Sequence, residues 1–424
     1  MTVTFVAVIT CSLFITGCGS DNSDFYDFRV TPEPVYVDGT NGTTGATGTA
    51  KDPLQSIQAA ITLAATEGRD VYVAEGLYLV DSSAGGSITM APGVNLYGGY
   101  KNAAGIWTRD IVTHITTIRD EATVGGTYDD PRRAVTCDFG PQTGDAPVFD
   151  GFKVEGGGGD LSAGIFIGED TSVVISHCVI EVGNATKGFG IKNYSTNRSS
   201  EALVTITDCS ISGGSGEQVT GIEVSNSNLT VRNTTITLLT AVITSTGIDC
   251  GYGDVHIEGC TINGGTATIT TRALYLNEAY RSTVTGCDIN GGSGGNASYG
   301  IQAMDTEDVS DITANTIDGG TGTLSVALEL GWVEVNPSVD DNLLLASGGT
   351  DRFGIYETGN VADPVSLTGN TFSASLLAGT GTSVFYHDVT NNIVTNIINI
   401  DAINSLDEDG LNPAGSVSGN QAGI

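Results

Sequence analysis

The feature that most constrains the fold is a sequence pattern that returns about every 27 residues. Segments such as TDCSISGG at 207–214 and EGCTINGG at 258–265 repeat a Cys, an Ile two residues later and a glycine pair. The anchor residues equivalent to these Ile positions are Val154, Ile180, Ile211, Ile236, Ile262, Ile289, Ile317, Leu344 and Phe372. A second series, in which an aliphatic residue follows Gly or Ala, keeps the same period: Ile165, Ile191, Ile222, Ile248, Leu274, Ile301, Leu328 and Ile355. Two independent series with one period predict a solenoid in which each repeat forms one coil.

Residues around the anchors alternate between apolar and polar, so each coil is predicted to consist of short β-strands. GIEVS at 221–225 and ALYLN at 273–277 show this alternation, and Val, Ile and Thr are enriched around them. The 3-and-4 spacing of amphipathic helices is missing from the repeats, which disfavours helical solenoids. Parallel strands of successive coils would lie about 4.8 Å apart. The predicted fold class is therefore all-β, a parallel β-helix.

Small and amide side chains are predicted to stack in a ladder two residues before each anchor. Its members are Phe152, Cys178, Cys209, Thr234, Cys260, Cys287, Asn315, Asn342 and Asn370. Stacked amides can bond one another, which satisfies polar groups that would otherwise be buried without a partner. The glycine pairs that follow the anchors predict turns with positive φ. We interpret the cysteines as packing residues, but disulfides between Cys178 and Cys209 and between Cys260 and Cys287 stay open, because adjacent coils would bring each pair together.

The net charge of the chain limits the classes of molecule that it can bind. Sixteen Lys and Arg stand against 49 Asp and Glu, a formal net charge of −33. Such a chain repels nucleic acid and anionic lipid headgroups, so we expect no nucleic-acid partner. A polysaccharide or another component of the cell envelope remains a suitable partner. We expect a monomer.

The N-terminal residues predict export and a lipid anchor. MTVTFVAVITCSLFITGC at 1–18 is an uncharged apolar run that is too short to span a bilayer as a stable helix. Its ending, Ile-Thr-Gly-Cys, resembles the bacterial lipobox, in which Cys is the lipid-modified first residue of the mature protein. We therefore predict a signal peptide at 1–17, lipidation of Cys18, a tether at 18–34 and a location at the outer membrane or cell surface. The membrane would be reached through the lipid only.

The segment that follows the tether is predicted to cap the solenoid. DPLQSIQAAITLAATEG at 52–68 has the spacing of an amphipathic helix, with Asp52 as its N-cap and Pro53 in its first turn. DVYVAEGLYLV at 70–80 and GVNLYGGY at 93–100 are typical of strands. A helix here would cover the open edge of the first coil.

These N-terminal motifs resemble the cap and first coils of right-handed parallel β-helix proteins of the pectin-lyase-like superfamily, and they are closest to its exported bacterial members of lipoprotein type. The resemblance implies a right-handed solenoid with an N-terminal capping helix. We place the cap and first coils at 35–130, the β-helix repeats at 131–390 and a C-terminal cap or tail at 391–424.

One strand face is predicted to carry the functional side chains. The outward residue after each member of the second series forms a line, here called the site ladder: Phe166, Lys192, Glu223, Asp249, Tyr275, Gln302, Glu329 and Tyr356, with Tyr386 expected next. Glu223 and Asp249 are the candidate catalytic residues, because adjacent coils would place their backbones about 5 Å apart. Such a pair suits a glycosidase or, equally, a Ca²⁺ site. The alternative interpretation is a solvated outer face in a chain rich in acids.

The remaining candidate site residues lie on or beside the same face. The candidate glycan-binding residues are Tyr275, Glu329, Trp332 and Tyr356. The candidate metal ligands are Glu278 and Asp305. No cofactor is predicted, although the acids would suit Ca²⁺.

Two functions stay open. We favour a non-catalytic surface lipoprotein of the cell envelope, a β-helix scaffold whose side wall binds a glycan or an envelope component. The alternative is a polysaccharide lyase or glycoside hydrolase that acts on the outward strand face. The Gly-His-Gly motif of polygalacturonases does not occur, and the even coil length leaves few residues for the walls of a cleft. NYSTNRSSEA at 193–202, beside Glu223, is the one place where we expect such a wall.

Overall fold

The computed structural model describes residues 32–197, 201–306, 308–331, 333, 338–358 and 365–372, together with the strand residues 375–379, 387–390, 393–394, 417–418 and 421–422. The chain divides into Met1–Pro32 and Glu33–Ile424. The predicted signal peptide and Cys18 lie outside the described residues. All of the described helices and strands belong to the second unit.

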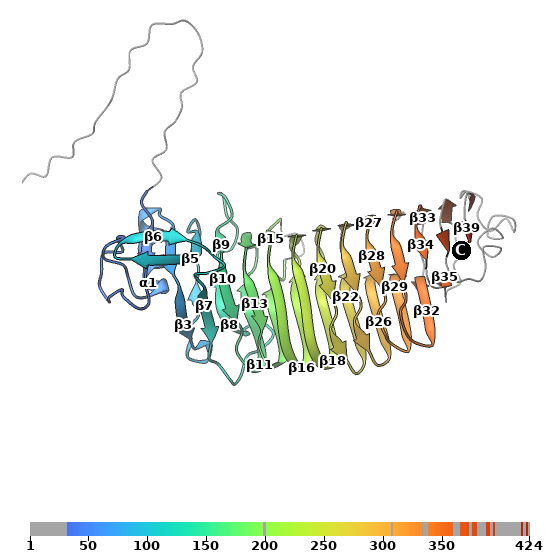
Figure 1. Ribbon diagram of the computed structural model, residues 1–424, viewed down its shortest axis with the longest axis horizontal. Helices are drawn as coiled ribbons and strands as arrows, with labels where there is room; N and C mark the ends of the chain where they lie inside the picture. Colours follow the sequence, from blue (N-terminus) through green and yellow to red (C-terminus); the bar gives the residue numbers. More distant parts are fainter. Residues whose placement is uncertain are drawn as a thin grey trace, which may run out of the picture. The chain divides into compact units, whose positions relative to one another are not determined.

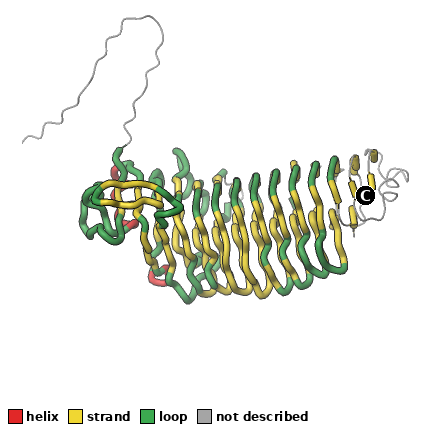
Figure 2. Tube along the Cα trace, viewed as in Figure 1, coloured by secondary structure: helices red, strands yellow, loops and turns green. Residues whose placement is uncertain are grey.

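Glu33–Ile424 is a parallel β-helix, as predicted. Its coils stack side by side from the N-terminal cap toward the C-terminal strands (Figure 1), and strands alternate with short turns within each coil (Figure 2). Among the described residues, the hairpin of β5 and β6 is the only antiparallel strand pair.

The strands fall into two sheets. The first sheet contains β1 (Val35–Val37), β2 (Val71–Ala74), β5 (Leu96–Ala103), β6 (Ile106–Arg109), β9 (Val148–Asp150), β12 (Val173–Ser176), β15 (Leu203–Thr207), β17 (Asn228–Arg232), β19 (Val255–Glu258), β23 (Arg281–Thr285), β27 (Asp308–Thr313), β30 (Ser338–Asp340), β33 (Val365–Thr368), β36 (His387–Thr390) and β38 (Val417–Ser418). The second sheet contains β3 (Gly76–Val80), β4 (Ile88–Thr89), β7 (Thr116–Asp120), β8 (Arg132–Cys137), β10 (Phe152–Glu155), β11 (Gly159–Ile167), β13 (Val179–Val182), β14 (Ala185–Asn193), β16 (Ser210–Ser225), β18 (Thr235–Gly251), β20 (Thr261–Asn263), β21 (Thr266–Ala267), β22 (Thr270–Asn277), β24 (Asp288–Asn290), β25 (Ser293–Gly294), β26 (Ala297–Met304), β28 (Thr316–Asp318), β29 (Leu324–Gly331), β31 (Leu343–Leu345), β32 (Asp351–Thr358), β34 (Thr371–Phe372), β35 (Ser375–Gly379), β37 (Ile393–Val394) and β39 (Gln421–Ala422). The pairing of β38 with β36 and of β39 with β37 carries the ladders into the segment predicted as a tail.

Both predicted anchor series form continuous inward ladders. Every residue of the first series pairs with its neighbour in the next coil, from Val154 to Phe372. The second series pairs in the same way from Ile165 to Ile355. All of these side chains are fully buried, so the sequence period is the period of the hydrophobic core.

The Cys and Asn ladder is also confirmed, and its asparagines bond as predicted. Asn342 Oδ1 accepts hydrogen bonds from the backbone N of Asn315 at 2.9 Å and from its Nδ2 at 3.0 Å, and Asn370 Oδ1 accepts the same pair from Asn342. The backbone N of Cys178 donates to Cys209 Sγ at 3.5 Å, and that of Cys260 donates to Cys287 Sγ at 3.4 Å. These four cysteines are buried free thiols, so neither pair forms a disulfide in this structure.

Helix α1 (Ile57–Glu67) caps the first coil, but its start differs from the prediction. Ser56 is the N-cap, and its hydroxyl accepts a hydrogen bond from the backbone N of Ala59 at 3.3 Å. Asp52 and Pro53 precede the helix, so neither the predicted cap nor the predicted first-turn position is correct, and the Asp52 carboxylate instead accepts two hydrogen bonds from Thr47. A short 3₁₀ helix, η1 (Ser82–Ala84), follows β3. No helix within the described residues is long and apolar enough to cross a membrane.

Candidate functional site

The site ladder exists in the predicted register. Its Cα partners follow one another from Phe166 through Glu223 and Asp249 to Tyr356. The next partner is Ala378, however, so the prediction of Tyr386 at this position is wrong. Tyr386 itself lies outside the described residues.

The ladder is not the solvated face that the alternative interpretation expected. The Lys192 side chain has no exposed surface, and the Glu223 side chain is 12% exposed. Tyr128, in the segment 121–131 between β7 and β8, lies over them and donates a hydrogen bond from Oη to Glu223 Oε1 at 2.8 Å. Tyr194 packs edge-on against the Tyr128 ring, with the two centroids 6.0 Å apart. The cover therefore comes from Tyr128 in 121–131, supported by Tyr194 from the described part of the predicted wall.

Glu223 is held as a hydrogen-bond acceptor. Lys192 Nζ donates to Glu223 Oε1, the same oxygen that accepts from Tyr128. The Lys192 ammonium also lies 3.7 Å from the centroid of the Tyr128 ring, a cation–π contact between a buried cation and a partly exposed ring. Burial lowers the pKa of Lys192, and the Glu223 carboxylate opposes this effect. Two donors therefore converge on one oxygen of Glu223.

Asp249, on the next coil, has a strongly changed acidity. Burial and then the neighbouring Glu223 carboxylate raise the pKa of Asp249 from its usual 3.8 to about 7, while Arg272 and Lys192 oppose the rise. This carboxyl group can therefore hold a proton at a pH at which an ordinary Asp side chain is ionised. Glu223 and Asp249 therefore form a pair in which one member accepts and the other can donate a proton, the arrangement that acid–base catalysis requires.

Arg272 occupies the outward row beside the site ladder and is held by its neighbours. Its Nε donates a hydrogen bond to Gln302 Oε1, and its guanidinium lies 4.8 Å from the ring centroid of Tyr275 and 6.0 Å from that of Tyr299. Gln302 Nε2 in turn donates to Glu329 Oε2 at 2.5 Å. These hydrogen bonds and ring contacts hold the Arg272 guanidinium in place, and its positive charge opposes the rise in the pKa of Asp249.

The predicted glycan-binding residues have different settings. Tyr275 and Tyr356 are partly exposed, and the Tyr356 ring stacks on Phe353 with centroids 5.1 Å apart. Glu329 is buried and bonded to Gln302, so its carboxylate supports Arg272 through Gln302 rather than facing a sugar. Trp332 lies outside the described residues.

The candidate metal ligands lie in the turns that follow the site-ladder strands. Tyr252, Glu278 and Asp305 occupy equivalent turn positions of successive coils, each with a positive φ between 51° and 56°. Tyr252 Oη donates a hydrogen bond to Glu278 Oε1. Within the part of the chain that the structure describes, no group of three or more His, Cys, Asp or Glu is arranged to hold a metal ion. Calcium binding at Glu278 and Asp305 stays a prediction.

Sequence reasoning found the carboxylate pair but not the groups that perturb it. The repeat spacing placed Lys192 on the site ladder but gave it no chemical role, and it did not place Arg272 or Tyr299 at the site. Their signal was present, because Arg272 and Tyr299 pair in register one row away from the ladder. Tyr128 had no such signal, since it lies outside the repeat.

Comparison with known proteins gives one family. The model of the family described as "Rhamnogalacturonase A/epimerase, pectate lyase-like" matches residues 42–270, more than half of the chain. The matched segment includes the Glu223 and Asp249 pair and Lys192, whereas Arg272 falls just beyond it. No curated protein matches the chain significantly.

Solved structures with similar chains are distant in sequence. The Dettilon tailspike protein gp208 is 12% identical, with 92% of this chain and 68% of that chain covered and a TM-score of 0.45. The A-module of mannuronan C-5 epimerase AlgE6 from Azotobacter vinelandii is 16% identical, with coverage of 90% and 98% and a TM-score of 0.45. PfbA, a surface adhesin of Streptococcus pneumoniae, is 13% identical, with coverage of 83% and 92% and a TM-score of 0.32. Nothing about the chemistry of this chain follows from likeness at this level.

Proposed function

The chain belongs to the rhamnogalacturonase A/epimerase, pectate lyase-like family, and from that premise we propose that it is an enzyme that cleaves an acidic polysaccharide with Glu223 and Asp249 as its acid–base pair. The observation that carries the proposal is the setting of these two carboxyl groups on adjacent coils. Lys192 lies on the same strand face and Tyr128 lies over it; both donate to Glu223, while burial and the Glu223 carboxylate raise the pKa of Asp249 to about 7. This reverses the preference for a non-catalytic scaffold that the sequence alone favoured.

In the proposed mechanism, Asp249 donates its proton to the leaving glycosidic oxygen. Glu223 accepts hydrogen bonds from both Lys192 and Tyr128. We propose that its carboxylate acts at the anomeric carbon, either as the nucleophile that replaces the leaving oxygen or as the base that deprotonates the attacking water. Adjacent coils separate the two backbones by about 4.8 Å, which places both carboxyl groups within reach of one glycosidic bond. Glycoside hydrolysis therefore fits these residues better than lyase chemistry.

Arg272 supports an acidic substrate. Its guanidinium is fixed by Gln302 and by the Tyr275 ring, and it lies close enough to Asp249 to lower the pKa of that carboxyl group. A fixed guanidinium binds a carboxylate in two-pronged geometry. We propose that Arg272 binds the carboxylate of a uronic acid unit, so that a local cation attracts the acidic ligand in a chain of net charge −33. Tyr356 and Phe353 would offer an aromatic surface farther along the polymer.

The test is a screen of purified protein against polygalacturonate, rhamnogalacturonan and alginate, with xylan and glucan as neutral polymers. New reducing ends without unsaturated product indicate hydrolysis, whereas unsaturated product indicates a lyase. Asp249→Asn and Glu223→Gln should each lower the rate by about 100-fold or more. Glu258→Gln, an exposed carboxylate on another strand, is the matched control and should retain the rate. Binding without product on every polymer would return the protein to the non-catalytic scaffold.

The pH profile of the same reaction gives an independent test. Because Asp249 must carry a proton to act as the acid, the rate should fall as the pH rises through about 7. A rate that stays constant well into the alkaline range would exclude Asp249 as the general acid.

We further propose, from the N-terminal residues alone, that the protein is exported and anchored through lipidated Cys18. Intact-mass measurement of membrane-extracted protein should show a diacyl or triacyl adduct on a chain that begins at Cys18. Cys18→Ala should abolish the adduct and release the protein from the membrane fraction. Recovery of the wild-type chain as an unmodified soluble protein would contradict the proposal.

A further inference from the structure

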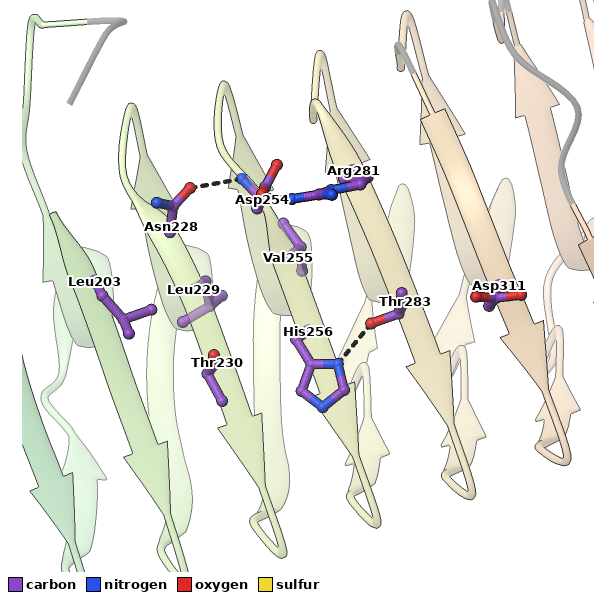
Figure 3. A pocket seen from close by; sticks show the side chains of 10 residues that line it. All are labelled: Leu203, Asn228, Leu229, Thr230, Asp254, Val255, His256, Arg281, Thr283 and Asp311. Carbon is purple, nitrogen blue, oxygen red and sulfur yellow. Dashed lines mark hydrogen bonds and ion pairs between the residues drawn. The ribbon is translucent and has the colours of Figure 1, made fainter. Parts of the chain in front are cut away.

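A second concave surface lies on a different wall of the β-helix from the site ladder. It is an open depression of about 480 Å³ formed by strands of the first sheet from β15 to β27. Figure 3 shows its side chains on successive parallel strands, with Asn228, Asp254 and Arg281 near one end of their strands and His256 farther along. Along the chain, each strand of this wall comes after a strand that carries a site-ladder residue. A short turn joins the two strands; between β18 and β19 this turn contains Tyr252. We name it the side-wall groove.

Planar polar side chains at coil spacing define this groove. Asn228 Oδ1 accepts a hydrogen bond from the backbone N of Asp254 at 2.9 Å, which leaves the Asn228 amide donors at the surface. Arg281 forms an ion pair with Asp254, and both side chains are well exposed, at 65% and 42%. His256 Nδ1 shares a hydrogen bond with the Thr283 hydroxyl at 2.6 Å, which fixes the ring. Amide, carboxylate, guanidinium and imidazole groups are thus held in place before any ligand arrives.

The lining excludes several classes of ligand. Among the described residues, no Trp, Tyr, Phe or Met lines the groove, so it lacks the aromatic anchors of protein interfaces. No group of three or more His, Cys, Asp or Glu in the described parts of the chain could hold a metal ion. Asp254 and the exposed Asp311, in a chain of net charge −33, disfavour nucleic acids and acidic polysaccharides.

A neutral glycan is the ligand that this lining suits. Amide, carboxylate and guanidinium groups each present two polar atoms side by side, which suits the paired hydroxyl groups of a sugar ring. The strands from β15 to β27 span four strand spacings, or about 19 Å. That length and the open form of the groove suit several sugar units of an extended chain rather than one small molecule.

We propose that the side-wall groove is a non-catalytic binding site for a neutral oligosaccharide, recognised by Asn228, Asp254, His256 and Arg281. The site is separate from the carboxylate pair and takes a ligand of different charge from the proposed substrate. It would hold the enzyme on a neutral glycan near its acidic substrate.

The experiment is titration calorimetry of the full chain with neutral tetrasaccharides of β-linked glucose, galactose, mannose and xylose. At least one should bind, and Arg281→Ala and His256→Ala should each weaken that binding by about tenfold or more. Arg119→Ala is the matched control: Arg119 is an exposed ion-pair residue of β7 in the second sheet, bonded to Glu155 outside the groove, and its loss should leave the affinity unchanged. Circular dichroism verifies that each variant folds.

Asp249→Asn should also bind the same tetrasaccharide as the wild type, which separates this site from the proposed catalytic one. The proposal is overturned if none of the four sugars binds at millimolar concentration. It is also overturned if binding survives both groove substitutions, or if Arg119→Ala weakens it equally. Displacement of the neutral sugar by polygalacturonate in Asp249→Asn would overturn the assignment of a neutral ligand.

Discussion

Replacing Asp249 by Asn should make the protein more stable at alkaline pH while it removes the proposed activity. The folded protein raises the pKa of Asp249 from 3.8 to about 7, chiefly through burial and the Glu223 carboxylate. Between these two pH values the folded state holds a proton that the unfolded state has released, so stability falls as the pH rises. Below pH 3.8 both states are protonated and the penalty vanishes, whereas above about pH 7 it is complete.

The size of this penalty follows from the two pKa values. Each pH unit between them corresponds to about 1.4 kcal/mol, so an ionised Asp249 destabilises the folded state by up to about 4 kcal/mol above pH 7. Asn has nearly the same shape and no charge, and therefore avoids the penalty. Retention of a destabilising group at a functional site is a familiar exchange of stability for activity.

Urea unfolding at several pH values measures the effect. The free energy of unfolding of Asp249→Asn should exceed that of the wild type at about pH 8, and the difference should shrink toward zero as the pH falls to about 4. Asp254→Asn is the control, because this exposed carboxylate is paired with Arg281 at the surface and should change stability by less than about 1 kcal/mol. A variant that is no more stable than the wild type in mildly alkaline buffer would refute the assignment of Asp249 as a desolvated acid.

Three further substitutions test the coil architecture. Asn342→Ala removes the oxygen that accepts both Asn315 hydrogen bonds and should lower the free energy of unfolding by about 3 kcal/mol, because the buried Asn315 donors lose that partner. An unchanged midpoint of urea unfolding would contradict the amide ladder. Ile262→Ala should lower the free energy of unfolding by about 2–5 kcal/mol, and Ile262→Val should lower it far less, because the Ile262 side chain is fully buried between two coils. Equal losses in the two variants would argue against an inward position. Ser56→Ala removes the N-cap hydroxyl that bonds Ala59 and should lower the free energy of unfolding by about 1 kcal/mol, measured by thermal or urea unfolding. If Asp52→Ala lowers it by this amount and Ser56→Ala does not, Asp52 is the cap after all.

The sequence located the carboxylate pair for the same reason that it predicted the coils. A parallel β-helix repeats by translation, so residues one period apart become Cα partners. The register Glu223 to Asp249 to Tyr275 can therefore be read directly from the spacing of Ile222, Ile248 and Leu274. The asparagine ladder was predictable on the same basis, since amides one period apart stack and can bond one another.

Other features depended on contacts that periodicity does not report. The start of α1 was missed because the bonds from Thr47 that occupy Asp52 come from an irregular loop. The role of Glu329 was missed because an outward position was taken to mean an exposed one, whereas Gln302 and the neighbouring coil bury its carboxylate. Spacing gives the direction of a side chain, but its exposure depends on which other residues cover it.

By itself, the sequence determined the stacking period, the inward residues and the neighbours along each ladder, because these follow from one repeated strand geometry. Only the tertiary structure decided that the ladder carries a covered pair of carboxyl groups. Tyr128 stands 95 residues before Glu223 in the chain, in a segment outside the repeat, yet its hydroxyl reaches that carboxylate. The acidity of Asp249 depends on burial and on the placement of Glu223, Lys192 and Arg272 around it. Burial and electrostatic interaction are properties of distance in space, and no sequence period encodes the distance to a residue that does not take part in the repeat.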